Sequence, residues 1–516
     1  FHTITTISQH FTTSVRTDSG FSFPIETGVH VARHPRHKAV NHQTYTACTT
    51  QHNTTQHKST KNIERQQYHT MGQPFSLLST TNTFYSGLLY YLCGGGRHSP
   101  YRLNNESTIS NLTIKPTDSK ELSLFKQHAR IHLYSLSSVW FLYNKPHYRK
   151  GCYRDDLVDN LRNVAIPGTG IPLSIVARNR YLGLMFLMTA YPAVSYVSAI
   201  HKWLKSGFKS SISEEYATRL LAPDDWFSYW RLNCNVVGMH SLLNDVPQGY
   251  QMENKWTFLD EGEQLGVPVS PFLKTSGIVV KHRNEEGGMG IHFYKNATAG
   301  GDWIIQETIS NSDWVNTMLP KNAPLSTFRV ITQSKASINL EKKPVPEDIT
   351  ALSCVFRAGR EGAATDHDSI LFDVDVKTGS IRGGTTNAHW YRLGLLEALP
   401  GRCPWRSSDT ERHQTHPDGD IPVSGNSVPD IKGMLTLVEE SHMKMCPDVP
   451  LAGWDVVFSA DSKVPICLLE VNLSCNFFRG SFDKKVYLDF VDESFAKVQD
   501  LRLAADASKK KFKVQK

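Results

Sequence analysis

The sequence predicts an α+β fold, and two observations carry that prediction. Residues 121–245 place apolar side chains three and four positions apart, as in "DWFSYWRLNCNVVGMHSLL", which is the spacing of amphipathic helices. From about residue 250 the chain changes to short β-branched and aromatic runs separated by glycine-containing turns, with helices expected near 256–266 and 429–446. Helices that precede and flank a run of strands are typical of α+β proteins.

Each expected strand is short, apolar on at least one face and bounded by turn residues. The strands lie in the runs "SGIVVKHRNEEGGMGIHFY", "DWIIQETI", "STFRVITQS", "ALSCVFRAGR", "ILFDVDVKTGSI" and "AGWDVVFSADSKVPICLLEV". The last run reads as a hairpin, with its turn near Asp461 to Pro465.

The two ends of the chain predict little ordered structure. Residues 1–70 are rich in Thr and His without a hydrophobic period, and the polar lead-in that follows extends the expected disordered or poorly ordered segment to 1–120. Met71 opens "MGQPFS", which fits the pattern for N-myristoylation if translation begins there. The basic run 496–516 is expected to be a solvated tail.

The charge distribution argues against a nucleic-acid-binding protein. Of the net charge of +7, residues 1–70 supply seven Lys/Arg against three Asp/Glu, and the remainder is nearly balanced. The nine cysteines are dispersed and form no CxxC pair. This usage indicates reduced thiols in a cytoplasmic compartment and argues against a structural zinc site.

One uncharged stretch leaves two interpretations open. Residues 181–200, "YLGLMFLMTAYPAVSYVSAI", are long enough to span a bilayer, but Pro192 lies in their middle. A buried or peripheral helix pair broken at the proline is the favoured interpretation, and a membrane-embedded segment is the alternative. The predicted localisation is therefore cytoplasmic, with membrane association left open.

Three oxygen-bearing side chains lie on the last predicted hairpin. Glu470 and Asn472 share one face of its second strand, because residues i and i+2 point the same way. Pairing across the turn brings Asp455, on the first strand, close to Glu470. A buried carboxylate needs a cation or a donor, and hard oxygen ligands at adjacent strand ends suit Mg²⁺. The alternative for these residues alone is a strand end that meets solvent or backbone donors.

A glycine-containing loop follows the first predicted strand of the β-rich region. In "IVVKHRNEEGGMGI" the strand ends at Lys281, and Gly287, Gly288 and Gly290 lead into the next strand. Glycines let backbone N–H groups approach a phosphate closely, and the lysine adds a charge for the same anion. No helix follows, so the loop matches neither of the common phosphate-binding fingerprints, and a plain turn is the alternative.

Two further segments carry polar residues at unusual places. Arg329 and Arg357 lie inside apolar strands, where an arginine is rare unless paired. One such arginine would indicate a structural ion pair, whereas two on strands that lead toward a carboxylate site predict anion binding. Gln306 and Glu307 directly follow the apolar run "DWII". This segment could offer backbone groups to the edge of an adenine ring.

In this order the elements resemble an ATP-grasp enzyme, and more closely the sugar-transfer-associated ATP-grasp family, also described as alpha-L-glutamate-ligase-related. The resemblance covers roughly residues 245–480 and lies in "ENKWTFL", "GVPVSPFL", "IVVKHRNEEGGMGI", "DWIIQETI", "LSTFRVIT", "CVFRAGREGAATD", "HPDGDIPVSG" and "AGWDVVFSADSKVPICLLEVN". It implies a nucleotide held between a small lobe, 246–320, and a large lobe, 321–495, after the helical region 121–245.

The resemblance also implies a role for each candidate residue. Lys255 and Lys281 would contact the ATP phosphates, and the loop 286–290 would close over them. The cofactor-binding set is therefore Lys255, Lys281, Glu286, Gly287, Gly288 and Gly290, together with Gln306 and Glu307 at the adenine hinge. Asp455, Glu470 and Asn472 would hold one or two Mg²⁺ ions, which Mn²⁺ could replace. The catalytic set is Arg329, Arg357 and Lys281, with the two arginines facing the transferred phosphate.

The chemistry that the resemblance implies is phosphorylation of a carboxylate by ATP, followed by attack of an amine or a similar nucleophile on the acyl phosphate. Such a reaction needs charge neutralisation and alignment rather than a protein nucleophile. ATP and a carboxylate-bearing substrate are the expected partners. Two alternatives are kept: a protein-modifying ligase resembling tubulin-tyrosine-ligase relatives, and a non-catalytic, nucleotide-binding, membrane-associated scaffold.

Overall fold

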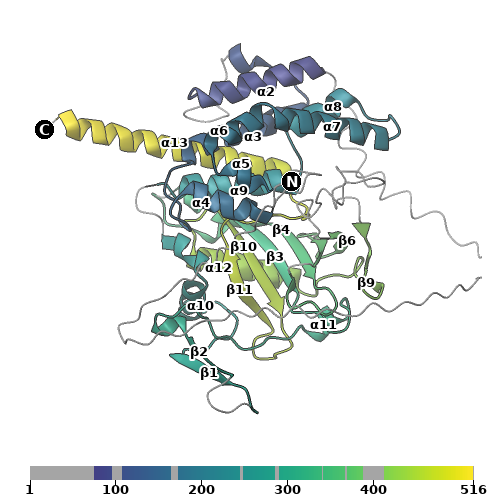
Figure 1. Cartoon of the computed structure of the whole chain (residues 1–516), viewed down its shortest axis with the longest axis vertical. Helices are drawn as coiled ribbons and strands as arrows, with labels where there is room; N and C mark the ends of the chain where they lie inside the picture. The colour runs from purple at the N-terminus through teal and green to yellow at the C-terminus, as the bar shows by residue number, and fades with distance from the viewer. Residues whose placement is uncertain are drawn as a thin grey trace, which may run out of the picture. The chain divides into compact units, whose positions relative to one another are not determined.

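The computed structural model describes eight ranges of the chain, which are 75–95, 107–163, 172–243, 248–284, 290–339, 341–366, 369–386 and 412–514. The chain divides into two compact units, Phe1–Gln67 and Tyr68–Lys516, and all described residues belong to the second. Within this second unit a helical region precedes a large antiparallel sheet, so the predicted α+β class is confirmed (Figure 1).

Eight α-helices of the described residues lie before residue 245 in the sequence. They are α2 (Leu77–Leu92), α3 (Lys120–Leu142), α4 (Tyr153–Asn160), α5 (Leu173–Ala177), α6 (Arg180–Met188), α7 (Ala190–Lys205), α8 (Ile212–Leu221) and α9 (Trp226–His240). Side chains cap several of them, since Ser119 Oγ accepts from Leu122 N at 3.1 Å and Asp225 Oδ1 accepts from Ser228 N at 2.9 Å. Such caps fix where a helix begins.

One expectation about the N-terminal segment is wrong, and the C-terminal run forms part of a helix. Helix α2 lies inside the segment 71–120 that was expected to be poorly ordered, because Phe84, Leu88 and Tyr91 recur at helical spacing and are buried. At the other end, the basic run is helical up to Val514. It continues α13 (Lys484–Val514), since Ala, Leu and Lys all favour the helix. The myristoylation pattern at Met71 lies outside the described residues.

The uncharged stretch 181–200 forms parts of two helices, as the favoured interpretation expected. The break lies at Thr189, between α6 and α7, rather than at Pro192. Pro192 occupies the first turn of α7, where its missing N–H is tolerated. Among the described residues, Arg180–Leu204 is the one helical stretch that is long and apolar enough to cross a membrane by length and composition, which is weak evidence by itself.

The central sheet has seven antiparallel strands in the order β11-β10-β3-β4-β5-β6-β7 (Figure 1). They are β3 (Thr327–Ser334), β4 (Ile349–Ala358), β5 (Ile370–Val374), β6 (Ile381–Thr386), β7 (Arg412–His413), β10 (Leu451–Phe458) and β11 (Ile466–Asn472). Directly after β7 in the chain, β8 (Thr415–His416) and β9 (Ile421–Pro422) form a separate two-stranded ladder. The predicted strands that correspond to β3, β4 and β5 and the final hairpin are confirmed, whereas β6 was not predicted beyond its first residue, Ile381.

The two faces of the sheet differ in polarity. The side chains of Phe328, Phe356 and Trp454 point to the same face of the sheet and are fully buried. Helix α12 (Ile431–Met445) packs there, where its His442 ring contacts Trp454 and its Nδ1 shares a 2.7 Å hydrogen bond with Thr332 Oγ1. By strand alternation the opposite face carries Arg329 and the polar residues paired with it.

The segment after β11 crosses this polar face and separates it from the helical region. A Cβ on Gly453 of β10 would lie 2.6 Å from Cβ of Cys475, which shows how closely the segment approaches. Farther along, Ser481 N donates to Asp373 Oδ1 on β5 at 2.7 Å. On its outer side the segment meets α9, where Asn233 Nδ2 donates to Cys475 O at 3.0 Å. We call residues 473–483 the crossing segment.

A smaller group of elements lies next to the β11 edge. It comprises α10 (Lys255–Gln264), the hairpin of β1 (Gly277–Lys281) and β2 (Ile291–Lys295), and the short α11 (Asp313–Asn316). The expected strand at 303–307 is wrong, because this segment forms only the isolated bridges Phe272↔Gln306 and Asn296↔Trp303. Residues 268–273, which include Phe272 of the first bridge, form a linker that reaches the sheet. Within it, Ser270 N donates to Leu468 O at 2.9 Å.

Candidate functional site

A buried ion-pair cluster lies on the polar face of the sheet. The register places Asp455 of β10 directly opposite Arg329 of β3. Arg329 binds both carboxylate oxygens of Asp455, with Nη2 at 2.8 Å from Oδ2 and Nε on Oδ1. Arg357 of β4 adds a longer contact, Nη1 to Oδ2 at 3.4 Å. The two strand arginines predicted from the sequence therefore meet the predicted carboxylate on three adjacent strands.

A second group of side chains lies at the edge strand, next to the buried pair. Glu470 of β11 is the register partner of Asp455, so the expected proximity of the two residues is confirmed. Its Oε2 lies 2.7 Å from Lys255 Nζ, and its Oε1 accepts from Asn472 Nδ2 at 3.2 Å. The register shifts just beyond this pair, so that Leu469 has no partner on β10. Such a bulge re-aims the neighbouring side chains.

Lys255 reaches the edge strand because helix α10 begins there. Asn254 caps the helix, with its Oδ1 accepting from Trp256 N at 3.0 Å and Thr257 N at 3.2 Å. The cap fixes the first residue of the helix and thereby the origin of the lysine side chain. The predicted Lys255 thus joins the cluster through Glu470.

Phe478 of the crossing segment covers both arginines. The Cζ atoms of Arg329 and Arg357 lie 5.6 Å and 5.8 Å from the centroid of its ring, within the range of cation–π attraction. Phe478 holds a positive φ of 49°, which is strained for a bulky residue. Its N–H donates to Asn476 Oδ1 at 2.7 Å, and this contact stabilises the turn that presents the ring.

The electrostatics of the buried pair follow from its contacts. Burial alone would raise the pKa of Asp455, but the charge and hydrogen bonds of Arg329, aided by Arg357, hold the pKa of this carboxyl below its ordinary value. Burial likewise opposes the charge of Arg329, whereas Asp455 and Glu470 raise the pKa of its guanidinium. Both groups are therefore ionised at neutral pH, and each satisfies the charge of the other.

Asp366 belongs to the site although it was not among the predicted residues. Its Oδ1 lies 3.0 Å from Arg357 Nη2, and its Oδ2 accepts from Thr327 Oγ1 at 2.6 Å. Burial raises the pKa of Asp366, with Arg357 opposing the shift. The aspartate follows "CVFRAGREGAA" in a loop, so only its position within a motif could have suggested it.

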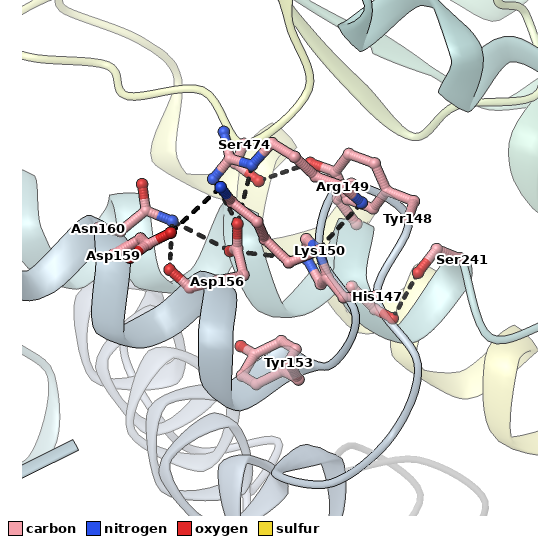
Figure 2. Close-up of polar contacts among 12 residues, drawn as sticks. His147, Tyr148, Arg149, Lys150, Tyr153, Asp156, Asp159, Asn160, Ser241 and Ser474 are labelled. Carbon is pink, nitrogen blue, oxygen red and sulfur yellow. Dashed lines mark hydrogen bonds and ion pairs between the residues drawn. The ribbon is translucent and has the colours of Figure 1, made fainter. Parts of the chain in front are cut away.

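A further polar cluster joins the helical region to the end of β11. Figure 2 shows Tyr148 and Arg149 lying against Ser474 and Asp156. The hydroxyl of Tyr148 lies 2.7 Å from Ser474 Oγ, and Arg149 Nε donates to Asp156 Oδ1 at 2.8 Å. We call this group, with Glu253, the junction cluster.

Glu253 ties the junction cluster to the candidate ligands. Its Oε1 accepts from Arg149 Nη1 at 3.0 Å, and its Oε2 accepts from Leu473 N at 2.8 Å. Leu473 directly follows Asn472, so this carboxylate fixes the backbone at the ligand-bearing end of the strand. Sequence reasoning missed the cluster because Arg149 and Glu253 lie 104 residues apart and neither forms part of a local pattern.

Glu253→Gln is expected to change stability in a pH-dependent way. Burial raises the pKa of Glu253, although the Leu473 N–H and Arg149 oppose the shift. A carboxyl with a raised folded-state pKa contributes most at acidic pH, and the contribution falls as pH rises through that pKa. Relative to the parent protein, the glutamine variant should therefore gain stability between acidic and neutral pH, as measured by urea unfolding. A trend in the opposite direction would mean that Arg149 outweighs burial.

The remaining predicted residues lie outside the cluster or outside the described ranges. Lys281 ends β1 on an exposed hairpin, where it pairs in register with Ile291. Gly290 closes that hairpin, and its carbonyl accepts from His282 N at 2.9 Å. Glu286, Gly287 and Gly288 are not among the described residues.

The predicted hinge residues are held against the linker to the sheet. Gln306 Nε2 donates to Ser270 Oγ at 2.5 Å, and Glu307 N donates to Pro271 O at 3.2 Å. The backbone N–H of Ser270 in turn donates to Leu468 O, and Leu468 lies two residues before Glu470. The hinge is thus connected to the ligand-bearing strand, although no described contact joins Gln306 or Glu307 to the arginine cluster.

The side chains of the cluster meet the requirements of a magnesium–nucleotide complex in part. Glu470 and Asn472 supply half-buried oxygen donors at a strand end, and the buried Nε of Arg357 has no hydrogen-bond partner among the described residues. Both features fit an anion with its metal. Asp455 fits less well, because arginine donors occupy both of its oxygens. In the described part of the chain, no three His, Cys, Asp or Glu side chains group as a metal site.

Comparisons with known proteins leave the family of the chain open. A scan against protein-family models finds no match, and no curated protein matches the sequence significantly.

Proposed function

We propose that the chain is an ATP- and Mg²⁺-dependent carboxylate ligase with an ATP-grasp fold. The observation that carries the proposal is that charged and polar side chains from four neighbouring strands and one helix lie together. They are Arg357 of β4, Arg329 of β3, Asp455 of β10, Glu470 and Asn472 of β11, and Lys255 of α10. Cations beside oxygen donors are what charge neutralisation of a polyphosphate requires.

The proposal assigns different tasks to the two strand arginines. Arg329 gives two of its donors to Asp455, so we assign it to positioning that carboxylate. Arg357 is less tightly paired and keeps an unpartnered buried Nε, so it is the better candidate to bind the transferred phosphate. Glu470 and Asn472 would hold the magnesium ion, which would neutralise charge on the nucleotide. Asp455 would join them only by giving up one arginine donor.

The remaining parts of the proposal follow the resemblance of the sequence. Lys281 and the loop 286–290 would close over the phosphates from the β1–β2 hairpin, and Gln306 and Glu307 would flank the adenine. The lobe boundaries would be 246–320 and 321–495. The carboxylate would accept the γ-phosphoryl group of ATP, releasing ADP, and the nucleophile would then displace inorganic phosphate from the acyl phosphate.

Thermal unfolding with nucleotide tests whether the chain binds ATP. A ligand at about 100 times its Kd stabilises the native state by about 2.7 kcal/mol, so MgATP should raise Tm by several degrees, and EDTA should reduce the shift. Arg357→Met should weaken it, whereas the matched variant Arg382→Met, an exposed arginine of β6 in the same sheet, should retain it. If millimolar MgATP leaves Tm unchanged, the nucleotide assignment fails.

Turnover separates a ligase from a nucleotide-binding scaffold. Release of ADP should rise when amino acids or acidic sugars are added, because the carboxylate is the phosphoryl acceptor. A Tm shift without ADP release for any carboxylate would favour the scaffold, and release that requires a protein acceptor would favour the protein-modifying ligase.

A further inference from the structure

The helices α6 and α7 carry an apolar surface that the described residues leave uncovered. Helix α6 is strongly apolar, "RYLGLMFLM", yet it has no buried residue. Its Tyr181 and Met185, one turn apart, are 62% and 57% exposed. On α7, Tyr196, Val197 and Leu204 continue an exposed stripe at helical spacing. Exposed apolar surface of this kind on a folded protein marks an interaction site.

The charges around this surface are all positive within its own segment. Residues 172–213 contain five Lys/Arg, namely Arg178, Arg180, Lys202, Lys205 and Lys209, and no Asp or Glu. Arg178, Lys202 and Lys209 are exposed, and none of the three forms an ion pair with a described residue. The nearest acidic groups on the following helix are Glu214 and Glu215, and the latter pairs with Arg219 at 3.8 Å.

Among the neighbouring elements, α2 and the end of α3 add aromatic and uncharged surface. Arg180 stacks on Trp140 of α3 at 4.8 Å and on Tyr181 at 5.2 Å. Helix α2, which hydrogen-bonds to the end of α6 through Tyr85 Oη and Met188 O at 2.8 Å, contains no charged residue. Tyrosine, tryptophan and basic residues beside an apolar stripe are the side chains that favour a membrane interface.

We propose that α6 and α7 dock on the surface of an anionic lipid bilayer. The apolar stripe would enter the acyl boundary while the basic residues contact anionic headgroups. This inference concerns a surface separate from the candidate ligase site and does not rest on the proposed function.

The inner contacts of the two helices favour docking on a membrane over spanning it. Tyr191 Oη donates to Arg219 O at 3.2 Å, and Arg219 Nη1 donates to Ser198 Oγ at 2.8 Å, which ties α7 to α8. Pro192, Ser195 and Ala199 on the same side are buried. A single spanning helix would have to lose these contacts and remove the break at Thr189.

Vesicle sedimentation of the full chain tests the inference. The chain should sediment with mixed phosphatidylserine–phosphatidylcholine vesicles, bind weakly to pure phosphatidylcholine vesicles, and be released by high salt. Because each basic residue near an anionic surface changes affinity by about fivefold, Lys202→Glu with Lys209→Glu should weaken binding by at least about 25-fold. The matched pair Lys342→Glu with Lys343→Glu, which makes the same charge change at exposed positions elsewhere, should bind as the parent does.

A second variant tests the apolar stripe. Tyr181→Gln with Met185→Gln should reduce sedimentation with the mixed vesicles, while circular dichroism and Tm remain those of the parent, because α6 buries neither side chain. The inference is overturned if the parent does not bind vesicles, if it binds both vesicle types equally, or if both lysine pairs weaken binding equally. Binding that survives high salt and alkaline carbonate would also overturn it, in favour of a spanning segment.

Discussion

Asp455→Asn should lower the free energy of unfolding by about 3–5 kcal/mol, because it would leave the buried guanidinium of Arg329 without a counter-charge. Arg329 and Asp455 are 8% and 4% exposed, so water cannot replace the lost carboxylate. Urea unfolding at neutral pH measures the change. Loss of activity in this variant would therefore not identify a metal ligand.

Two comparisons separate the buried charge from other effects of the substitution. Asp461→Asn, in the exposed turn of the same hairpin, should cost little. Replacing both members of the pair by apolar residues, Arg329→Met with Asp455→Leu, should recover much of the loss, because no unpaired charge remains. If Asp455→Asn costs under about 1 kcal/mol, the pair is not the buried counter-charge that its contacts indicate.

The acid dependence of the parent protein should report the same pair. The pKa of Asp455 lies below its ordinary value of 3.8, so its contribution to stability is complete above that pH and is lost as pH falls through the depressed pKa. The parent should lose stability relative to Asp455→Asn over this acidic range, since the variant has no carboxyl to protonate. A constant difference between the two proteins across the range would contradict the assignment.

The sequence predicted the strands better than the surroundings of the site. Alternation and a short turn were sufficient to bring Asp455 close to Glu470, because antiparallel pairing about a known turn has few registers, whereas the exact register depends on the bulge at Leu469. The same periodicity put Arg329 and Arg357 inside strands. Their mutual contacts could not be read from the sequence, because they depend on which strands become neighbours, and β10 inserts between β3 and β11.

The residues that sequence reasoning missed share a physical reason. Arg149 and Glu253 lie far apart in the chain, and Phe478 covers the arginines only because the crossing segment turns back over the sheet at a positive φ. Helix α2 was missed for a different reason. Its Thr, Ser and Asn residues resemble those of a polar loop, although the buried Phe84 and Leu88 follow a helical period.

Glu470→Gln should lower Mg²⁺-dependent ATP turnover by about three powers of ten, equivalent to about 4 kcal/mol of transition-state stabilisation, with little change in stability. Unlike Asp455, Glu470 is reached by solvent, with its side chain 24% exposed, and its partner Lys255 is 68% exposed. An exposed ion pair of this kind contributes at most about 1 kcal/mol. The activity lost would therefore report the role of the carboxylate rather than unfolding.

Glu263→Gln is the matched control for this substitution. Glu263 lies on α10 and also pairs with an exposed lysine, Lys274, at 2.7 Å, but it lies outside the cluster. It should keep full turnover, and its Tm should change as little as that of Glu470→Gln. In Glu470→Gln the apparent affinity for Mg²⁺ should fall together with the rate, because one oxygen ligand has lost its charge. Equal turnover in the two variants would remove Glu470 from the metal site and, with it, the main support for the ligase proposal.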